Sequence, residues 1–114
     1  YAPYSNFKVG AGGCGADGAI YAGGNVENVA YPEGACAEAG PIAAMVAAGV
    51  TSLTEVCVIA DSPSPVTPCG GCRQRIREFS TPSTMIHICG PEGIRKSMTM
   101  EELLPFSFGP DNLK

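Results

Sequence analysis

Three cysteines and one glutamate constrain this chain more than any other feature. They occur in two short segments, C-A-E at residues 36–38 and P-C-G-G-C at residues 68–72. Three thiolates can hold a Zn²⁺ ion and leave the fourth tetrahedral position open. Glu38, two residues from a ligand, can move protons without binding the metal. The sequence therefore predicts a hydrolytic zinc site with Cys36, Cys69 and Cys72 as ligands, on a fold that brings the two segments together.

Two other interpretations of the cysteines compete with this one. A closed structural site needs a fourth ligand, and the candidates are Cys14, Cys57, Cys89 and His87. Cys57 and Cys89 lie in apolar, strand-like runs, where free cysteine usually serves as a small buried hydrophobe. A C-x-x-C pair can also be a redox dithiol. The pattern favours the open catalytic site, with a structural zinc second and a thioredoxin-like dithiol third.

Composition excludes several classes of protein. The 114 residues are 45% hydrophobic and 16% charged, which is typical of one folded domain, expected to span 1–114. No apolar run reaches membrane-spanning length and no signal peptide opens the chain, although the missing initiator Met suggests a trimmed N-terminus. Ligand-like cysteine spacing predicts reduced thiols and a cytoplasmic location. A net charge of −4 argues against nucleic acid as a partner and favours a small, uncharged substrate.

Patterning predicts alternating strands and helices. The expected elements are a hairpin at 8–15 and 20–24, a helix at 35–49, a strand at 54–61, a helix at 70–79, a strand at 85–89, an edge strand at 92–98 and a capped short helix at 99–104. This order predicts an α/β domain in which helices cover a mixed sheet. Both cysteine segments would open helices, whose free N–H groups stabilise thiolates.

The chain resembles the small, homotetrameric zinc-dependent cytidine deaminases over nearly its whole length. The resemblance rests on Y-A-P-Y-S-N-F-K-V-G-A at 1–11, N-V-E-N at 25–28, C-A-E at 36–38, P-C-G-G-C-R-Q at 68–74 and L-L-P-F-S-F-G-P at 103–110. C-x-E with P-C-x-x-C is the signature of zinc nucleobase deaminases. The resemblance implies a three-layer α/β/α sandwich around a mixed five-stranded sheet. The helix that usually precedes the Y-A-P-Y segment in this family is absent from the chain.

The resemblance also implies roles for individual residues. Cys36, Cys69 and Cys72 match the ligands of one Zn²⁺ per subunit, and Glu38 matches the proton shuttle. The other matches are substrate-binding residues: Phe7 against the base, Asn25 and Glu27 at the ribose hydroxyl, the Ala37 backbone at the pyrimidine edge, and the aromatics Tyr31 and Phe108, typically across a subunit boundary.

One departure from the family concerns the residues after C-A-E. The tetrameric enzymes usually continue with an arginine that hydrogen-bonds the thiolates, whereas this chain has Ala39 and Gly40. Some divergent members, including the blasticidin S deaminase branch, also lack it. We expect backbone N–H groups to replace it, with Arg73 as a secondary donor and no other Arg or Lys within reach of a ligand sulfur.

The predicted activity is hydrolytic deamination of cytidine or deoxycytidine in pyrimidine salvage, by a homotetramer with no nucleic-acid or membrane partner. Two alternatives stay open. One is the same chemistry on a modified cytosine nucleoside or a blasticidin-like aminopyrimidine nucleoside. The other is a zinc-stabilised binding module without turnover.

Overall fold

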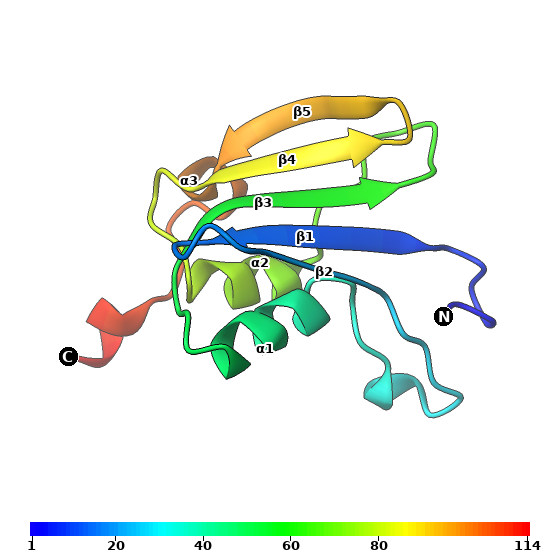
Figure 1. The fold of residues 1–114 in the computed structure, drawn as a ribbon, viewed down its shortest axis with the longest axis horizontal. Coiled ribbons are helices and arrows are strands. Elements are labelled where there is room, and N and C mark those ends of the chain that lie inside the picture. The colour runs from blue at the N-terminus through cyan, green and yellow to red at the C-terminus, as the bar shows by residue number, and fades with distance from the viewer.

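The computed structural model describes residues 1–114 and contains a mixed five-stranded sheet with helices packed against it (Figure 1). The strands are β1 (Val9–Gly15), β2 (Ile20–Gly24), β3 (Leu53–Ala60), β4 (Met85–Gly90) and β5 (Gly93–Thr99). The α-helices are α1 (Ala39–Ala47), α2 (Gly70–Arg77) and α3 (Met100–Leu103), and short 3₁₀ turns lie at Tyr31–Glu33 and Pro110–Leu113. No helix is long and apolar enough to cross a bilayer.

The sheet has the order β2-β1-β3-β4-β5. Only β3 and β4 pair in parallel, and α2 connects them; the other neighbours are antiparallel. The α/β class, the mixed sheet of five strands and the edge position of β5 are confirmed. Because the parallel strands both end near the start of α2, this connection sets the position of the second cysteine segment.

One hydrophobic core holds the helices on the sheet. Alternate residues of β3 and β4 point into it, among them Val56, Val58, Ile86 and Ile88. All three helices contribute to the same cluster. Helix α1 contributes Ile42 and Met45, α2 contributes Ile76, and α3 contributes Met100 and Leu103. All three helices therefore cover one face of the sheet, so residues 1–114 show the mixed sheet and one of the two helical layers that the resemblance implies (Figure 1).

The first helix is shorter than its sequence predicts. It begins at Ala39 rather than at residue 35, and its first backbone bond runs from Ile42 N–H to Glu38 C=O. Pro41 explains the difference, because a proline has no N–H and its ring would clash with a helical carbonyl four residues earlier. The C-A-E segment consequently lies in the turn before α1.

The last helix follows its predicted capping signal. The Thr99 hydroxyl accepts a bond from the Glu102 backbone N–H, and the Glu102 carboxylate accepts one from the Thr99 N–H. This reciprocal pair satisfies two free donors of the first turn. It seats Met100 and Leu103 in the core beside α2.

Candidate active site

The three predicted ligand cysteines converge where the starts of α1 and α2 meet. Cys36 lies in the turn before α1, Cys69 is the N-cap of α2, and Cys72 is in the first turn of α2. Their Sγ atoms all lie within 4.8 Å of one another, and those of Cys36 and Cys69 are 3.9 Å apart. Segments far apart in sequence thus place three thiols around one point.

The donor set fits Zn²⁺. Zn–S bonds of about 2.3 Å in a tetrahedron require sulfurs about 3.8 Å apart, close to the Cys36–Cys69 separation. No fourth cysteine, histidine or carboxylate belongs to this group, so a closed four-ligand site is not formed. The site fits one zinc ion per subunit with one position open to a small molecule.

The other ligand candidates lie on the sheet, away from this group. Cys57 and Cys89 are on β3 and β4 with their Sγ atoms 3.1 Å apart. His87 Nδ1 contacts the Ser97 Oγ at 2.7 Å, and its Nε2 lies 3.7 Å from a Glu55 carboxylate oxygen. The prediction that His87 is a satisfied strand histidine is confirmed.

The three thiols differ in their electrostatic surroundings. The backbone N–H of Cys72 points to Cys69 and lowers the pKa of that thiol below its ordinary value. Burial, followed by the charge of Glu38, raises the pKa of Cys72, which has no exposed surface. Burial is also the main cause of a raised pKa at Cys36. The expected backbone N–H contact is thus found at Cys69, and Cys72 is the ligand with the greatest need of a further donor.

That further donor is Arg75, which the sequence analysis did not identify. Its Nη1 lies 3.4 Å from the Cys72 Sγ, so the expectation of no second basic residue near a ligand sulfur was wrong. The reason is helical geometry: residues three apart lie on the same helix face, so Arg75 reaches back over Cys72. The i, i+3 spacing within the predicted helix is visible in the sequence, but it only permits such a contact and does not show that the side chain makes it.

Arg73 has a different task from the one expected. Its guanidinium donates to the Pro68 carbonyl at 2.8 Å, the Leu103 carbonyl at 3.0 Å and the Thr67 hydroxyl at 3.0 Å. None of these partners is a ligand sulfur. Arg73 therefore ties the loop before Cys69 to the end of α3.

Glu38 lies beside the cysteines in a cavity of about 200 Å³. Its side chain is buried, with 4% of its surface exposed. The lining also includes the predicted residues Cys36, Ala37, Cys69 and Asn25, together with Val9, Val58, Val66, Thr67 and Pro68. Val66 and Thr67, which sequence reasoning missed, directly precede the P-C-G-G-C segment. The site therefore combines three thiols, a buried carboxyl group and apolar walls.

Asn25 and Glu27 fasten the N-terminal residues to the body of the protein. Asn25 Oδ1 accepts from the Val9 N–H at 3.0 Å, and its Nδ2 donates to the Phe7 carbonyl at 2.9 Å. Glu27 accepts from the backbone N–H groups of Tyr4 and Ser5 and from the Ser5 hydroxyl. These bonds, led by that hydroxyl, lower the pKa of Glu27. Asn25 lines the cavity, whereas Glu27 lines a different surface depression together with Tyr31.

Three predicted aromatic residues lie outside the cysteine cavity of the single chain. Phe7 is 42% exposed, Phe108 is 58% exposed and Tyr31 is 76% exposed. The Phe108 backbone carbonyl accepts a bond from Gln74 Nε2 at 2.9 Å, which places it beside α2. One chain therefore brings together the three candidate metal ligands, Glu38, Ala37 and Asn25, but not these aromatic groups.

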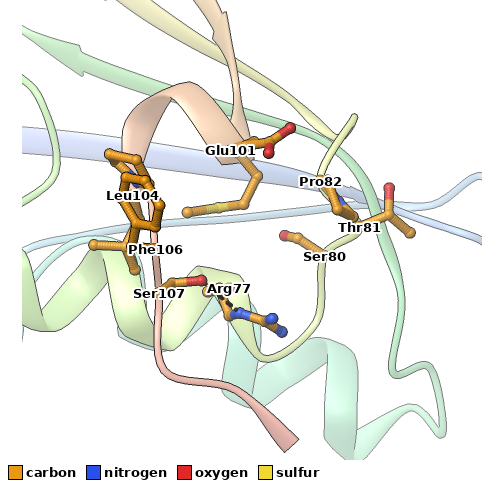
Figure 2. Close-up of a pocket in the computed structure, with 10 residues that line it drawn as sticks. Arg77, Ser80, Thr81, Pro82, Glu101, Leu104, Phe106 and Ser107 are labelled. Atoms are coloured by element: carbon orange, nitrogen blue, oxygen red, sulfur yellow. Dashed lines mark hydrogen bonds between the residues drawn. The ribbon is translucent and has the colours of Figure 1, made fainter. Parts of the chain in front are cut away.

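A separate cavity of about 330 Å³ lies between the end of α2, α3 and the C-terminal segment. In Figure 2, Arg77 and Ser107 approach each other at its edge, joined by a 3.0 Å bond from Arg77 Nε to the Ser107 hydroxyl. No cysteine lines this cavity. Arg77 thus shares a helix with Arg75 but faces different partners.

Comparison with known proteins agrees with this geometry. The family model for the cytidine and deoxycytidylate deaminase zinc-binding region matches residues 1–88. A cytidine deaminase of Sporosarcina psychrophila is 42% identical over 99% of this chain and 83% of its own length. A cytidine deaminase of Mycobacterium tuberculosis is 36% identical over 99% of this chain and 81% of its own.

Solved structures give the same result. A crystal structure of cytidine deaminase from Burkholderia pseudomallei superposes with a TM-score of 0.88 at 36% identity, covering 95% of this chain and 87% of that one. Together, the convergent cysteines, the buried glutamate and these similarities show that the chain belongs to the cytidine and deoxycytidylate deaminase family of zinc enzymes.

Proposed function

We propose that this protein hydrolyses cytidine and 2′-deoxycytidine to uridine and 2′-deoxyuridine, with release of ammonia. The observation that carries the proposal is the cavity that Glu38 shares with Cys36 and Cys69, together with the absence of a fourth protein ligand from the cysteine group. A structural zinc site is closed by four protein ligands and needs neither an open position nor a buried carboxyl group beside it. The relatives named cytidine deaminase support the choice of substrate.

In this proposal Glu38 carries the protons. When bound, Zn²⁺ supplies a Lewis acid that makes a water molecule acidic near neutral pH. Glu38 accepts a proton from the attacking water, delivers it to N3 of the cytosine ring, and helps to protonate the amine that leaves C4. The apolar walls Val9, Val58 and Val66 exclude bulk water, which strengthens these electrostatic interactions.

The test is a uridine-formation assay combined with metal analysis. We expect one zinc per chain, equimolar uridine and ammonia from cytidine, loss of turnover on chelation and recovery on adding zinc. Cytidine binding with stoichiometric zinc but no product would favour the zinc-stabilised binding module instead.

We also propose that nucleosides, not nucleotides, are the substrates, with Asn25 and Glu27 at the ribose and Phe7 and the Ala37 backbone at the base. Asn25 supports this by lining the cavity. Hydrogen bonds lower the pKa of Glu27 below its ordinary value and so favour the charged carboxylate, which would repel a 3′-phosphate. Comparable rates on cytidine and its 3′-phosphate at pH 5 and pH 7 would refute this placement.

A homotetramer would complete the site. Tyr31 and Phe108 are exposed, so a neighbouring subunit is needed for either to meet a base in the cavity. Helix α1 supports the same conclusion, since Pro41, Ile42 and Met45 are buried while Ala43, Ala44, Val46 and Ala47 form an apolar exposed side. Association through that side would bury it. A monomer at micromolar concentration in sedimentation velocity would refute the proposal.

A second substrate class follows from the start of α1. Ala39 and Gly40 supply no side-chain donor, and the space beside Gly40 is open. This departure from the family favours testing modified cytosine nucleosides and blasticidin-like aminopyrimidine nucleosides against cytidine. We place the reaction in cytoplasmic pyrimidine salvage. A kcat/KM that is higher for a modified nucleoside than for cytidine would contradict this role.

A further inference from the structure

We infer that Arg75 is a positioning residue of the zinc centre: its guanidinium holds the Cys72 thiolate and offsets the negative charge of a three-thiolate site. The inference rests on the proposed function only in assuming that the three cysteines bind zinc. Its primary observation is the 3.4 Å contact from Arg75 Nη1 to Cys72 Sγ, one helical turn apart on α2.

The site has an excess of negative charge. A Zn²⁺ ion with three thiolates carries one net negative charge, and the carboxyl group of Glu38 is buried beside it with 4% exposure. Buried charges are costly unless donors or opposite charges accompany them. Cys72 has no exposed surface, so water cannot fulfil this need at its sulfur.

Among the basic residues, Arg75 alone donates a hydrogen bond to a sulfur of the cysteine group. The Arg73 guanidinium donates its hydrogen bonds to two backbone carbonyls and a hydroxyl. Arg77 donates to Ser107 at the edge of the other cavity (Figure 2). Ala39 and Gly40, at the start of α1, have no side-chain donor.

The charge of Arg75 is free to act on the thiolate. No carboxylate oxygen lies within 4.0 Å of the Arg75 nitrogens. The basic residues that do form ion pairs are His87, Arg95 and Lys114. Its only hydrogen-bond partner is the sulfur of Cys72. A guanidinium without a competing anion can donate a charge-assisted hydrogen bond to the thiolate.

Groups that support metal ligands usually change metal affinity or activity by about 10- to 100-fold when removed. Arg75 is exposed, so solvent screens part of its charge. We therefore expect removal of the Arg75 guanidinium to weaken zinc affinity by about 10-fold, the lower end of this range.

The experiment measures zinc affinity by chelator competition in Arg75→Met, Arg75→Lys and the matched control Arg77→Met. Methionine keeps an unbranched side chain and a good helix propensity. We expect Arg75→Met to bind zinc about 10-fold more weakly, Arg75→Lys to recover part of that loss, and Arg77→Met to match wild type. In cobalt-substituted protein, only the Arg75 variants should shift the thiolate-to-cobalt charge-transfer band.

Two controls separate the possible failures. Cys69→Ser should abolish stoichiometric zinc binding; if it does not, the cysteine site and the proposed function fail. If Cys69→Ser behaves as expected while Arg75→Met keeps wild-type affinity and an unshifted cobalt band, the inference about Arg75 alone is overturned. An equal loss in Arg77→Met would also overturn it, because the effect would then reflect net charge and not the contact with Cys72.

Discussion

The cysteines at the helix starts and the cysteines of the sheet show how backbone context decides what a thiol can do. Cys36, Cys69 and Cys72 lie where α1 and α2 begin, and their sulfurs gather around one point. Cys57 and Cys89, on β3 and β4, have their Sγ atoms even closer together, at 3.1 Å, yet no third ligand joins them. In a strand the backbone N–H groups are used by the sheet, whereas the first turn of a helix leaves them free to meet a sulfur.

The largest expected effect tests this division directly. Cys69→Ser should lose stoichiometric zinc and all measurable turnover, because two remaining thiols cannot complete the site. Cys57→Ser is the matched control on β3 and should keep full zinc content by metal analysis. Loss of zinc from the Cys57 variant would show that the sheet cysteines take part in metal binding.

The next effect separates metal binding from proton transfer within the helix-start region. Glu38→Gln should keep zinc and the fold but lose turnover by at least about 10²-fold, since an amide cannot accept the water proton. Uridine formation and zinc content are measured on the same sample, and circular dichroism checks the fold. Near-wild-type turnover would remove Glu38 from the mechanism.

A smaller effect compares the reactivity of the two kinds of thiol. Burial and the Cys89 thiol raise the pKa of Cys57 to about 11, whereas the pKa of Cys69 is lowered. Below pH 11 Cys57 is mostly protonated and unreactive, so its alkylation should accelerate as pH rises towards 11. In zinc-free protein at pH 7.5, iodoacetamide should modify Cys69 at least about 10-fold faster than Cys57, after allowing for the greater nucleophilicity of a high-pKa thiolate.

Peptide mass spectrometry follows both sites in one digest. Zinc should protect Cys69 and leave the slow rate at Cys57 unchanged. Equal rates at the two sites in zinc-free protein would contradict the contrast between helix-start and sheet thiols.

The smallest effect concerns Arg73, next to a ligand in sequence but bonded to Pro68, Thr67 and Leu103. Arg73→Ala should reduce the free energy of unfolding by about 1 kcal/mol, measured by urea denaturation, through lost hydrogen bonds. Zinc affinity should change less than in Arg75→Met. Outright loss of zinc would show that Arg73, and not Arg75, supports the thiolates.

Local signals in the sequence predicted many of the elements. The Thr99–Glu102 capping box, the apolar run of β3 and the hairpin of β1 and β2 all appear as expected, within a residue or two. Helix α1 differs by four residues at its start because the tolerance for Pro41 was overestimated. Each of these features depends on neighbours in the chain, which is why periodicity and turn residues could predict them.

The sequence by itself determined which three thiols could bind a metal ion together, which carboxyl group accompanies them, and the helix start at which each cysteine segment lies. Those properties depend on residue type and short spacing. Only the tertiary structure decided that Arg75 contacts Cys72, that Arg73 does not, and that Tyr31 and Phe108 lie outside the cavity of a single chain. The direction of a long side chain and the surroundings of an exposed ring depend on packing between distant segments, which no local pattern encodes.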